Sequence, residues 1–199
     1  MKYINDIRNQ LQDVRFPVFK VSDLKNIEGL SDSYRRLLLH NLLFRGEIVQ
    51  ITRGVYTFHK DVDVVCFAFS PSYYGLEDAL SIRGLSDQAT NPIVMSKRNV
   101  RRGTRHFIGR NYLVYHVDKR LFFGYEMVKH NDFWIPVSDP EKTLIDMLYF
   151  GYEVRDELWS RLLKTISKSK LRGYLGFYRA SFMEKVLDEV KAKNKSSIE

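Results

Sequence analysis

A group of hydrogen-bonding side chains lies between residues 33 and 53, and its members are Ser33, Arg35, Arg36, His40 and Arg53. Guanidinium, imidazole and hydroxyl groups donate hydrogen bonds to phosphate oxygens and to the base edges of DNA. If Leu38 and Leu42 face a core, the helical period puts the first four members on or beside the opposite face of one helix, with Arg35 at its border. These five residues are therefore the candidate DNA contacts.

Three helices are expected in the first 45 residues. Apolar residues three and four apart predict one over residues 2–14, and a short one follows over residues 23–27. The third spans residues 33–45, and either Ser31 or Asp32 is its N-terminal cap. The third helix carries four of the five candidate DNA contacts.

A hairpin is expected directly after the third helix. Two short alternating runs, residues 47–51 and 55–58, flank a turn that contains Arg53 and Gly54. Gly54 can adopt the positive φ that such a turn needs. The order helix, helix, turn, helix, hairpin is that of a winged helix-turn-helix, which places a helix in the major groove and Arg53 beside a phosphate or the minor groove.

The third helix has more apolar residues than one buried face requires, and they are Leu37, Leu38, Leu39, Leu42, Leu43 and Phe44. They cover most of its circumference, so that Leu43 is expected to be partly exposed. We therefore expect something besides DNA to cover part of this helix, either the following domain or a second subunit. The alternative is a buried helix of an ordinary helical subdomain.

The net charge of +8 is concentrated at the two ends of the chain. Residues 1–60 carry ten Lys and Arg against six Asp and Glu, residues 61–150 carry eleven against eleven, and residues 151–199 carry eleven against seven. Two ends of net charge +4 suit a polyanionic partner, and with the hairpin pattern they favour double-stranded DNA.

The single cysteine, Cys66, excludes an intramolecular disulfide, and no Cys/His cluster has zinc-ligand spacing. The sequence also has no Gly-rich loop of phosphate-cradle spacing, so we expect neither a metal nor a cofactor. No apolar stretch approaches the ~18 residues of a membrane span, and no signal peptide pattern is present. We therefore expect a cytoplasmic protein that does not associate with a membrane.

A region rich in β-branched and aromatic residues begins near residue 61. Its candidate strands, separated by Gly, Asn and Asp, are residues 62–69, 93–95, 105–108, 112–117, 122–128 and 133–137. A helix is expected over residues 73–82, with Ser70 or Ser72 as its cap. Ser138-Asp139-Pro140-Glu141 predicts another helix, with Ser138 at the N-cap.

Residues 153–193 form two or three amphipathic helices in this interpretation, interrupted near residues 173–176. The predicted fold class is α+β. An N-terminal winged helix-turn-helix over residues 1–60 precedes a mixed α/β domain over residues 61–199, which has an antiparallel-rich sheet and C-terminal helices.

Three segments in this order resemble the AbiEi-type antitoxin and transcriptional regulator family over roughly residues 15–150. They are Arg53-Gly54-Val55-Tyr56, then Leu76-Glu77-Asp78-Ala79-Leu80 leading to Gly84-Leu85-Ser86, and finally Val137-Ser138-Asp139-Pro140-Glu141-Lys142-Thr143-Leu144-Ile145-Asp146. The resemblance implies a type IV toxin-antitoxin system. In it, the winged helix binds operator DNA of its own operon as an autorepressor, and the C-terminal domain counteracts a nucleotidyltransferase-like toxin.

By the same resemblance, Arg35, Arg36 and His40 fall on the DNA-reading helix and Arg53 on the wing. The Ser-Asp-Pro-Glu-Lys-Thr-Leu motif is interpreted as structural, a capped helix start. Binding as a homodimer, or as pairs on inverted repeats, is compatible with this function. The alternative is a stand-alone winged-helix regulator without a toxin partner.

A basic stretch without any acidic residue lies in the second region, and its members are Lys97, Arg98, Arg101, Arg102, Arg105 and Arg110. It has two interpretations of equal weight. The first is a surface that binds phosphate or an acidic partner. The second is an edge strand that its charges keep soluble.

Enzyme activity is the least favoured hypothesis. Glu126-x-x-Lys129 and Asp139-x-Glu141-Lys142 are faintly similar to the carboxylate–lysine sites of metal-dependent nucleases. Asp139 and Glu141, however, belong to a helix start, where the helix dipole already favours negative charge. We therefore expect a non-enzymatic protein, with Trp134 and Trp159 in its core.

Overall fold

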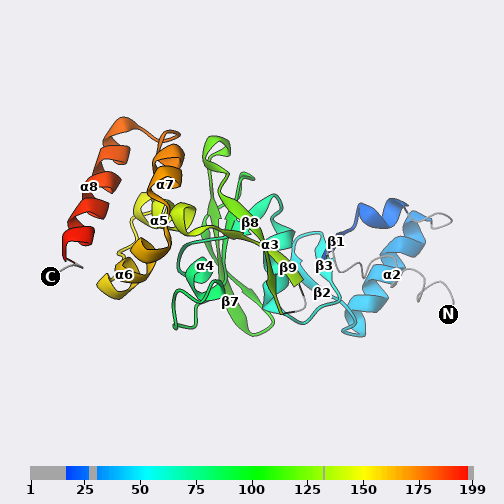
Figure 1. Cartoon of the computed structure of the whole chain (residues 1–199). Helices are drawn as coiled ribbons and strands as arrows, with labels where there is room; N and C mark the ends of the chain where they lie inside the picture. The colour runs from blue at the N-terminus through cyan, green and yellow to red at the C-terminus, as the bar shows by residue number, and fades with distance from the viewer. Residues whose placement is uncertain (1–16, 27–30, 132, 197–199) are drawn as a thin grey trace.

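The computed structural model describes residues 17–26, 31–131 and 133–196. A three-stranded sheet and helix α2 lie at one end of an elongated molecule, a six-stranded sheet lies in the middle, and helices α5 to α8 lie at the other end (Figure 1). The predicted α+β class, with C-terminal helices, is confirmed. The helix expected over residues 2–14 lies outside the described residues.

The N-terminal end is a small sheet with one helix against it. Its elements are β1 (Phe19–Lys20), the 3-10 helix η1 (Asp23–Asn26), α2 (Asp32–Phe44), β2 (Val49–Thr52) and β3 (Val55–Thr57). Both strand pairs are antiparallel, in the order β1-β3-β2. Ser31 caps α2 by accepting a hydrogen bond from Tyr34 N at 3.3 Å, and Gly46 follows with a φ of +64°. The helix therefore lies within one residue of the predicted bounds at each end.

Strands β2 and β3 form the predicted hairpin. Thr52 pairs with Val55, so Arg53 and Gly54 make the turn between them. Gly54 has a φ of +76°, which an L side chain adopts only with strain. The side chain of Arg53 is exposed at this turn.

The six-stranded sheet has the order β6-β7-β5-β4-β9-β8. Its strands are β4 (Ser72–Tyr74), β5 (Ile93–Ser96), β6 (Gly103–Phe107), β7 (Arg110–His116), β8 (Tyr125–His130) and β9 (Phe133–Ser138). The pairs β4–β9 and β5–β7 are parallel, and the other three are antiparallel. The sheet is therefore antiparallel-rich, as predicted.

The strand predicted over residues 62–69 is wrong. This segment forms the 3-10 helix η2 (Val62–Val64) and the short helix α3 (Val65–Ala68). Asp61 starts the turn by accepting a hydrogen bond from Asp63 N at 2.9 Å, and Cys66 N donates to the Tyr74 hydroxyl at 3.1 Å. A short apolar run that is buried on every side has no periodicity that separates a strand from a helix.

The helix predicted over residues 73–82 begins later than expected. Ser72–Tyr74 is strand β4, and helix α4 (Leu76–Ile82) starts at Gly75 rather than at Ser70 or Ser72. The strand forms because β5 and β9 flank it and satisfy its backbone groups. Partners distant in sequence therefore override the local helical pattern.

The C-terminal part is helical. The 3-10 helix η3 (Lys119–Leu121) precedes β8, and after β9 come α5 (Pro140–Tyr149), α6 (Asp156–Thr165), α7 (Lys168–Leu175) and α8 (Ala180–Ser196). Asp139, not Ser138, is the N-cap of α5, and it accepts from Lys142 N at 2.8 Å. Trp159 is buried as predicted, whereas Trp134 is 58% exposed on β9, so its predicted place in the core is wrong.

The hairpin shares a hydrophobic core with the six-stranded sheet. Ile51 and Val55 are buried in the same cluster as Val65, Tyr112 and Val137. The Tyr112 hydroxyl also donates a hydrogen bond to the Ile51 carbonyl at 3.3 Å. The hairpin therefore packs firmly on the central sheet. None of the helices in the described ranges is both long and apolar enough to span a membrane.

Candidate nucleic-acid interface

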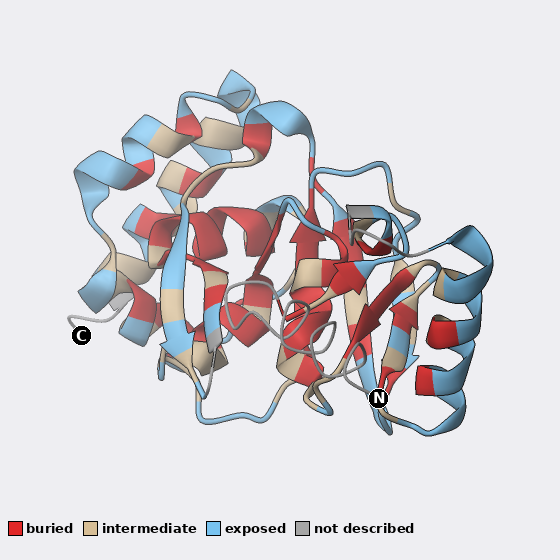
Figure 2. Cartoon of the chain, turned by 90° about the vertical axis from the view of Figure 1, so that its right-hand side faces the viewer, coloured by how far each residue is buried: buried red, intermediate tan, exposed pale blue. Residues whose placement is uncertain are grey.

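Helix α2 buries one narrow side against its sheet and leaves the rest open (Figure 2). Leu38 and Leu42 are its buried residues, as the sequence predicts. Ser33, Arg36 and His40 are exposed, and the helical period places them on the side away from those two leucines. The structure thus brings three of the candidate DNA contacts together on one free surface.

Arg35 has different surroundings from Arg36. Its side chain is only 18% exposed, its Nη1 contacts Asp32 at 2.6 Å, and its Nη2 donates to the Lys25 carbonyl at 3.3 Å. Arg36 donates through Nε alone, to the Asp32 carbonyl at 3.4 Å, so that its terminal nitrogens have no partner among the described residues. Arg35 joins α2 to η1, while Arg36 keeps its guanidinium fork free.

The apolar residues of α2 other than the buried Leu38 and Leu42 are largely exposed. Leu37 is 54% and Phe44 is 85% exposed, and Leu43 is also open to solvent. The Phe44 ring stacks with His40 at a centroid distance of 6.5 Å. The following domain therefore does not cover this side of the helix.

Arg53 is exposed at the tip of the hairpin. Its side chain has no hydrogen bond or ion pair within the part of the chain that the structure describes. A free guanidinium at a wing tip can reach a phosphate or the minor groove beside a bound helix.

The basic stretch extends along the whole β6–β7 hairpin and does not form a single cluster. Strand β6 is an edge strand, in which Gly103 pairs with Val114 and Phe107 with Arg110. Arg102 and Arg110 therefore lie at opposite ends of the hairpin. Both interpretations of this stretch remain compatible with an edge strand.

Several members of the basic stretch pack on aromatic rings. The Arg102 guanidinium lies 4.3 Å from the Tyr115 ring centroid, and that of Arg105 lies 4.7 Å from the Phe69 ring centroid. Lys97 lies 5.5 Å from the Phe122 ring centroid.

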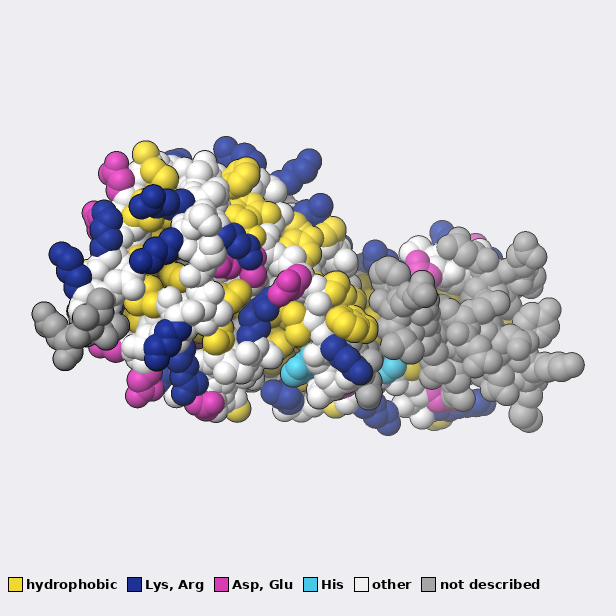
Figure 3. All heavy atoms as spheres, viewed as in Figure 1, with side chains coloured by type: hydrophobic (Ala, Val, Ile, Leu, Met, Phe, Trp, Pro, Cys, Tyr) yellow, Lys and Arg dark blue, Asp and Glu magenta, His cyan; other side chains and the backbone are white. Residues whose placement is uncertain are grey.

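Two other members of the stretch bind backbone carbonyls. Arg98 donates to the Ala68 carbonyl at 3.4 Å, and Arg110 donates to the Thr90 carbonyl at 3.5 Å. Among the described residues, the side chain of Arg101 has no such partner. Over the face in Figure 3, Lys and Arg side chains are likewise dispersed among hydrophobic ones.

The Ser-Asp-Pro-Glu motif joins helix α5 to helix α7. Besides capping α5, Asp139 accepts a hydrogen bond from the Tyr174 hydroxyl at 2.8 Å and contacts Lys170 at 3.1 Å. Glu141 contacts the same Lys170 at 3.2 Å and accepts from Ser167 N at 2.6 Å. These carboxylates are therefore engaged in internal contacts, in agreement with the structural interpretation of the motif.

The motif also carries a buried ion pair. Lys142 Nζ contacts Asp146 Oδ1 and donates to the Tyr178 hydroxyl at 3.0 Å, and the Tyr73 hydroxyl donates to Asp146 Oδ2 at 2.8 Å. Burial lowers the pKa of Lys142 and raises the pKa of Asp146, although each charge partly offsets the shift of the other. The pair holds β4, α5 and the segment before α8 together.

The residues of the nuclease hypothesis are not gathered into one site. Glu126 lies on β8 and contacts Arg83 at 2.9 Å, whereas Asp139 and Glu141 face Lys170 at the start of α5. In the ranges that the structure describes, no group of three or more His, Cys, Asp or Glu could hold a metal ion.

Comparisons with known proteins agree with the N-terminal architecture. Residues 10–59 match the family model described as "Transcriptional regulator, AbiEi antitoxin". Among solved structures, the chain is similar to the crystal structure of the RV2827C protein from Mycobacterium tuberculosis, with a TM-score of 0.61 and 13% identity, over 97% of this chain and 78% of that one. This identity supports a common fold only. No curated protein matches the chain. Over residues 10–59, the chain is therefore similar to the AbiEi antitoxin transcriptional regulators, the family that its sequence resembles.

Proposed function

We propose that this chain is a DNA-binding autorepressor and the antitoxin of a type IV toxin-antitoxin system. Residues 1–60 carry DNA binding in this proposal, and residues 61–199 counteract a nucleotidyltransferase-like toxin. The observation that supports DNA binding most strongly is the exposed side of α2, on which Ser33, Arg36 and His40 lie together.

The recognition step follows from the chemistry of this side of α2. An α-helix fits the major groove, where a free guanidinium fork such as that of Arg36 pairs with the O6 and N7 atoms of guanine. Ser33 and His40 supply shorter donors on either side along the helix. Arg53 contacts the backbone or the minor groove from the wing.

Arg35 positions the recognition helix in this proposal and does not read bases. Its guanidinium already contacts Asp32 and the Lys25 carbonyl. Through these contacts it fixes the angle between η1 and α2. A substitution at Arg35 would therefore weaken binding to all DNA sequences alike.

We assign the basic stretch to the DNA side rather than to the toxin. Arg105 of the stretch pairs with Tyr112, whose hydroxyl donates a hydrogen bond to the Ile51 carbonyl of the wing at 3.3 Å, so the β6–β7 hairpin lies beside the wing. Arg101 is its free guanidinium, and one phosphate contact there would extend the interface beyond the winged helix. Replacing Arg101 with Ala should reduce the slope of log affinity against log salt by about one.

Fluorescence anisotropy with duplexes from the region upstream of its own gene tests DNA binding. Arg36→Ala should lose ~1–3 kcal/mol on the operator and relax its specificity. Arg172→Ala, which removes the same charge from the exposed side of α7, is the matched control and should bind as the wild type does. Equal affinity of the wild type for operator and random duplex at moderate salt would exclude the repressor function.

The antitoxin function is supported by the family description that residues 10–59 match. Co-expression of the full chain with the neighbouring open reading frame tests it, with growth as the measurement. The full-length Arg36→Ala variant should lose repression and still rescue growth, because toxin neutralisation is assigned to residues 61–199. A lack of rescue by the wild-type chain would leave a stand-alone regulator as the function.

A further inference from the structure

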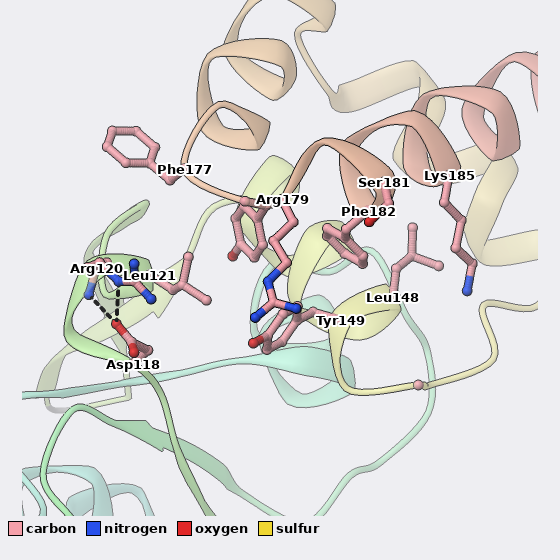
Figure 4. A pocket seen from close by; sticks show the side chains of 12 residues that line it. Asp118, Arg120, Leu121, Leu148, Tyr149, Phe177, Arg179, Ser181, Phe182 and Lys185 are labelled. Atoms are coloured by element: carbon pink, nitrogen blue, oxygen red, sulfur yellow. Dashed lines mark hydrogen bonds and ion pairs between the residues drawn. The ribbon is translucent and has the colours of Figure 1, made fainter.

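A solvent-open cleft of about 640 Å³ lies at the end of the molecule opposite to α2, where η3, the end of α5 and the start of α8 meet (Figure 4). Its size is within the roughly 300–1,000 Å³ of small-molecule sites. Three of the side chains that line it are cationic and four are aromatic: Arg120, Arg179, Lys185, Tyr149, Phe177, Tyr178 and Phe182. None of these residues belongs to the family motifs or to the DNA interface.

Two cations of the cleft are free. The side chains of Arg179 and Lys185 form no hydrogen bond or ion pair within the described ranges. Arg120 differs, because its Nε contacts Asp118 at 3.3 Å. Asp118 is the one acidic side chain that lines the cleft, so the lining has a net charge of +2. Cations that gather in a concave site without internal partners favour an anionic ligand.

The free cations and one ring lie along one side of the start of α8, with Arg179 directly before the helix and Phe182 and Lys185 within it. Arg179, Phe182 and Lys185 are spaced by three residues, which places them next to one another along a helix. Figure 4 shows the Arg179 guanidinium directed toward Tyr149 and Lys185 extended from α8 toward the same side of the cleft. Arg179 also stands at the start of the 17-residue helix α8, where the helix dipole adds positive potential.

The aromatic wall of the cleft is preformed. Tyr149 makes edge contacts with Tyr178 and with Phe182, at centroid distances of 5.5 Å in both pairs, and Tyr178 lies 5.2 Å from Phe182. The Tyr178 hydroxyl is held by Lys142 Nζ of the buried ion pair. Tyr149 is nevertheless 48% exposed, so an open ring surface faces the ligand space. Such a surface favours a planar aromatic group.

These two features together select the ligand chemistry. An inorganic anion would use the cations and leave the rings in water, whereas an apolar ligand would leave the cations unpaired. A ligand with a planar base and a phosphate group uses both, as nucleotide-binding surfaces combine stacking with Lys and Arg. We propose that this cleft binds a free nucleotide, with its phosphates on Arg179 and Lys185 and its base against Tyr149 and Phe182.

A mononucleotide fits better than a nucleic-acid strand. The cleft occupies one site between α5 and α8, whereas a strand needs a groove that follows its backbone over several nucleotides. The site also lies at the far end of the molecule from the winged helix (Figure 1). The proposed nucleotide site is therefore separate from the DNA-binding surface proposed for α2.

Direct titration of the full-length protein with the fluorescent probes mant-ATP and mant-GTP tests the ligand class. At least one probe should bind. Unlabelled ATP or GTP should displace it at concentrations at least about tenfold lower than those at which tripolyphosphate or the free nucleoside displaces it. If neither probe binds, or if tripolyphosphate competes as well as the nucleotides, the proposal is overturned. A short single-stranded oligonucleotide that competes better than any mononucleotide would also overturn it.

Variants then locate the site. Arg179 and Lys185 are exposed, so Arg179→Ala and Lys185→Ala should keep the fold, and together they should weaken probe binding by at least about tenfold. Asp118→Asn removes the opposing charge and should strengthen binding. Lys164→Ala together with Lys168→Ala, an equal loss of charge at exposed residues outside the cleft, is the control. Wild-type affinity in the double variant, or the same loss in the control, would exclude the cleft.

Discussion

Helices α2 and α5 both start at a side-chain cap, Ser31 and Asp139, and both carry charged residues in their first turns. Their surroundings differ. Helix α2 buries only Leu38 and Leu42, whereas every residue of α5 from Glu141 to Met147 is buried (Figure 2). The charged groups of α5 all have internal partners, but Arg36 on α2 keeps its guanidinium fork free. Charged residues near a helix start therefore indicate function only where the fold leaves them unpartnered.

The same difference implies that charged residues at the two ends of the molecule contribute differently to the free energy of unfolding. A buried charge has a large effect on stability, because removing its partner leaves an uncompensated charge away from water. An exposed charge on α2 has little effect on stability and is available for a ligand. Substitutions at the two ends should therefore differ strongly in their effects on unfolding.

The largest effect is expected from the buried pair of α5. Asp146→Ala should lower the free energy of unfolding by about 3–5 kcal/mol, because it leaves Lys142 buried without its counter-charge. Urea denaturation measures the change. The double variant Lys142→Met with Asp146→Leu should recover most of the loss, since it removes both charges and keeps the volume filled. A loss below about 1 kcal/mol in the single variant would contradict the contrast between the two helices.

The sequence predicted the N-terminal end better than the middle. Local signals define helix α2 and the hairpin, namely the cap at Ser31 and the positive φ at Gly46 and Gly54. The prediction for residues 72–74 is wrong because this strand depends on strands β5 and β9, which lie far away in sequence. The prediction for residues 62–69 is wrong because a short buried apolar run has no periodicity that separates a strand from a helix. The sequence pattern also put Trp134 in the core, yet it lies exposed on β9.

The cleft at α8 could not be predicted from sequence for a similar reason. Its lining comes from three segments, residues 118–121, 148–151 and 177–185, that no motif connects. Only the spacing of Arg179, Phe182 and Lys185 is visible in the sequence, and the same spacing occurs on many solvated helices. By contrast, the side of α2 that carries Arg36 follows from helical periodicity once Leu38 and Leu42 are buried.

A pH-dependent effect of intermediate size is expected from Asp78 in α4. Burial raises the pKa of this carboxyl from 3.8 to about 7, against the hydrogen bonds from Ile93 N at 3.1 Å and Thr90 at 3.0 Å. The folded state therefore binds a proton more tightly than the unfolded state, and the stability from Asp78 falls as the pH rises from about 4 through 7. Between pH 5 and pH 8 the loss should be about 2–3 kcal/mol.

Asp78→Asn isolates this contribution. Urea denaturation at several pH values should give a flatter stability profile for the variant than for the wild type, because the amide does not titrate. Asp118→Asn is the control, since that exposed carboxyl has its pKa lowered by the hydrogen bond from Arg120 N and should leave the profile between pH 5 and pH 8 unchanged. Parallel profiles for the wild type and Asp78→Asn would show that the carboxyl is not perturbed by its burial.

Substitutions of two glycines, one at each end of the molecule, should change the stability by smaller amounts and in opposite directions. Gly54→Ala in the wing should destabilise the fold by about 1 kcal/mol, because its φ of +76° strains an L residue even though no atom lies within 4 Å of the new Cβ. Gly173→Ala inside α7 also meets open space and should instead stabilise by about 0.5–1 kcal/mol. Thermal unfolding measures both. Changes of the same sign would mean that backbone conformation does not determine the effect of these two substitutions on stability.

The smallest effect is expected from the exposed leucine of α2. Leu37 is 54% exposed, so Leu37→Gln should change the free energy of unfolding by less than about 0.5 kcal/mol. Leu38, the next residue, is buried, so Leu38→Ala should lower the free energy of unfolding by about 2–5 kcal/mol. The measurement is urea denaturation at two protein concentrations. A loss at Leu37 that grows with protein concentration would mean that a second subunit covers this side of α2. The helix would then need to be released before it could enter DNA, because the covered side lies next to Arg36 and His40.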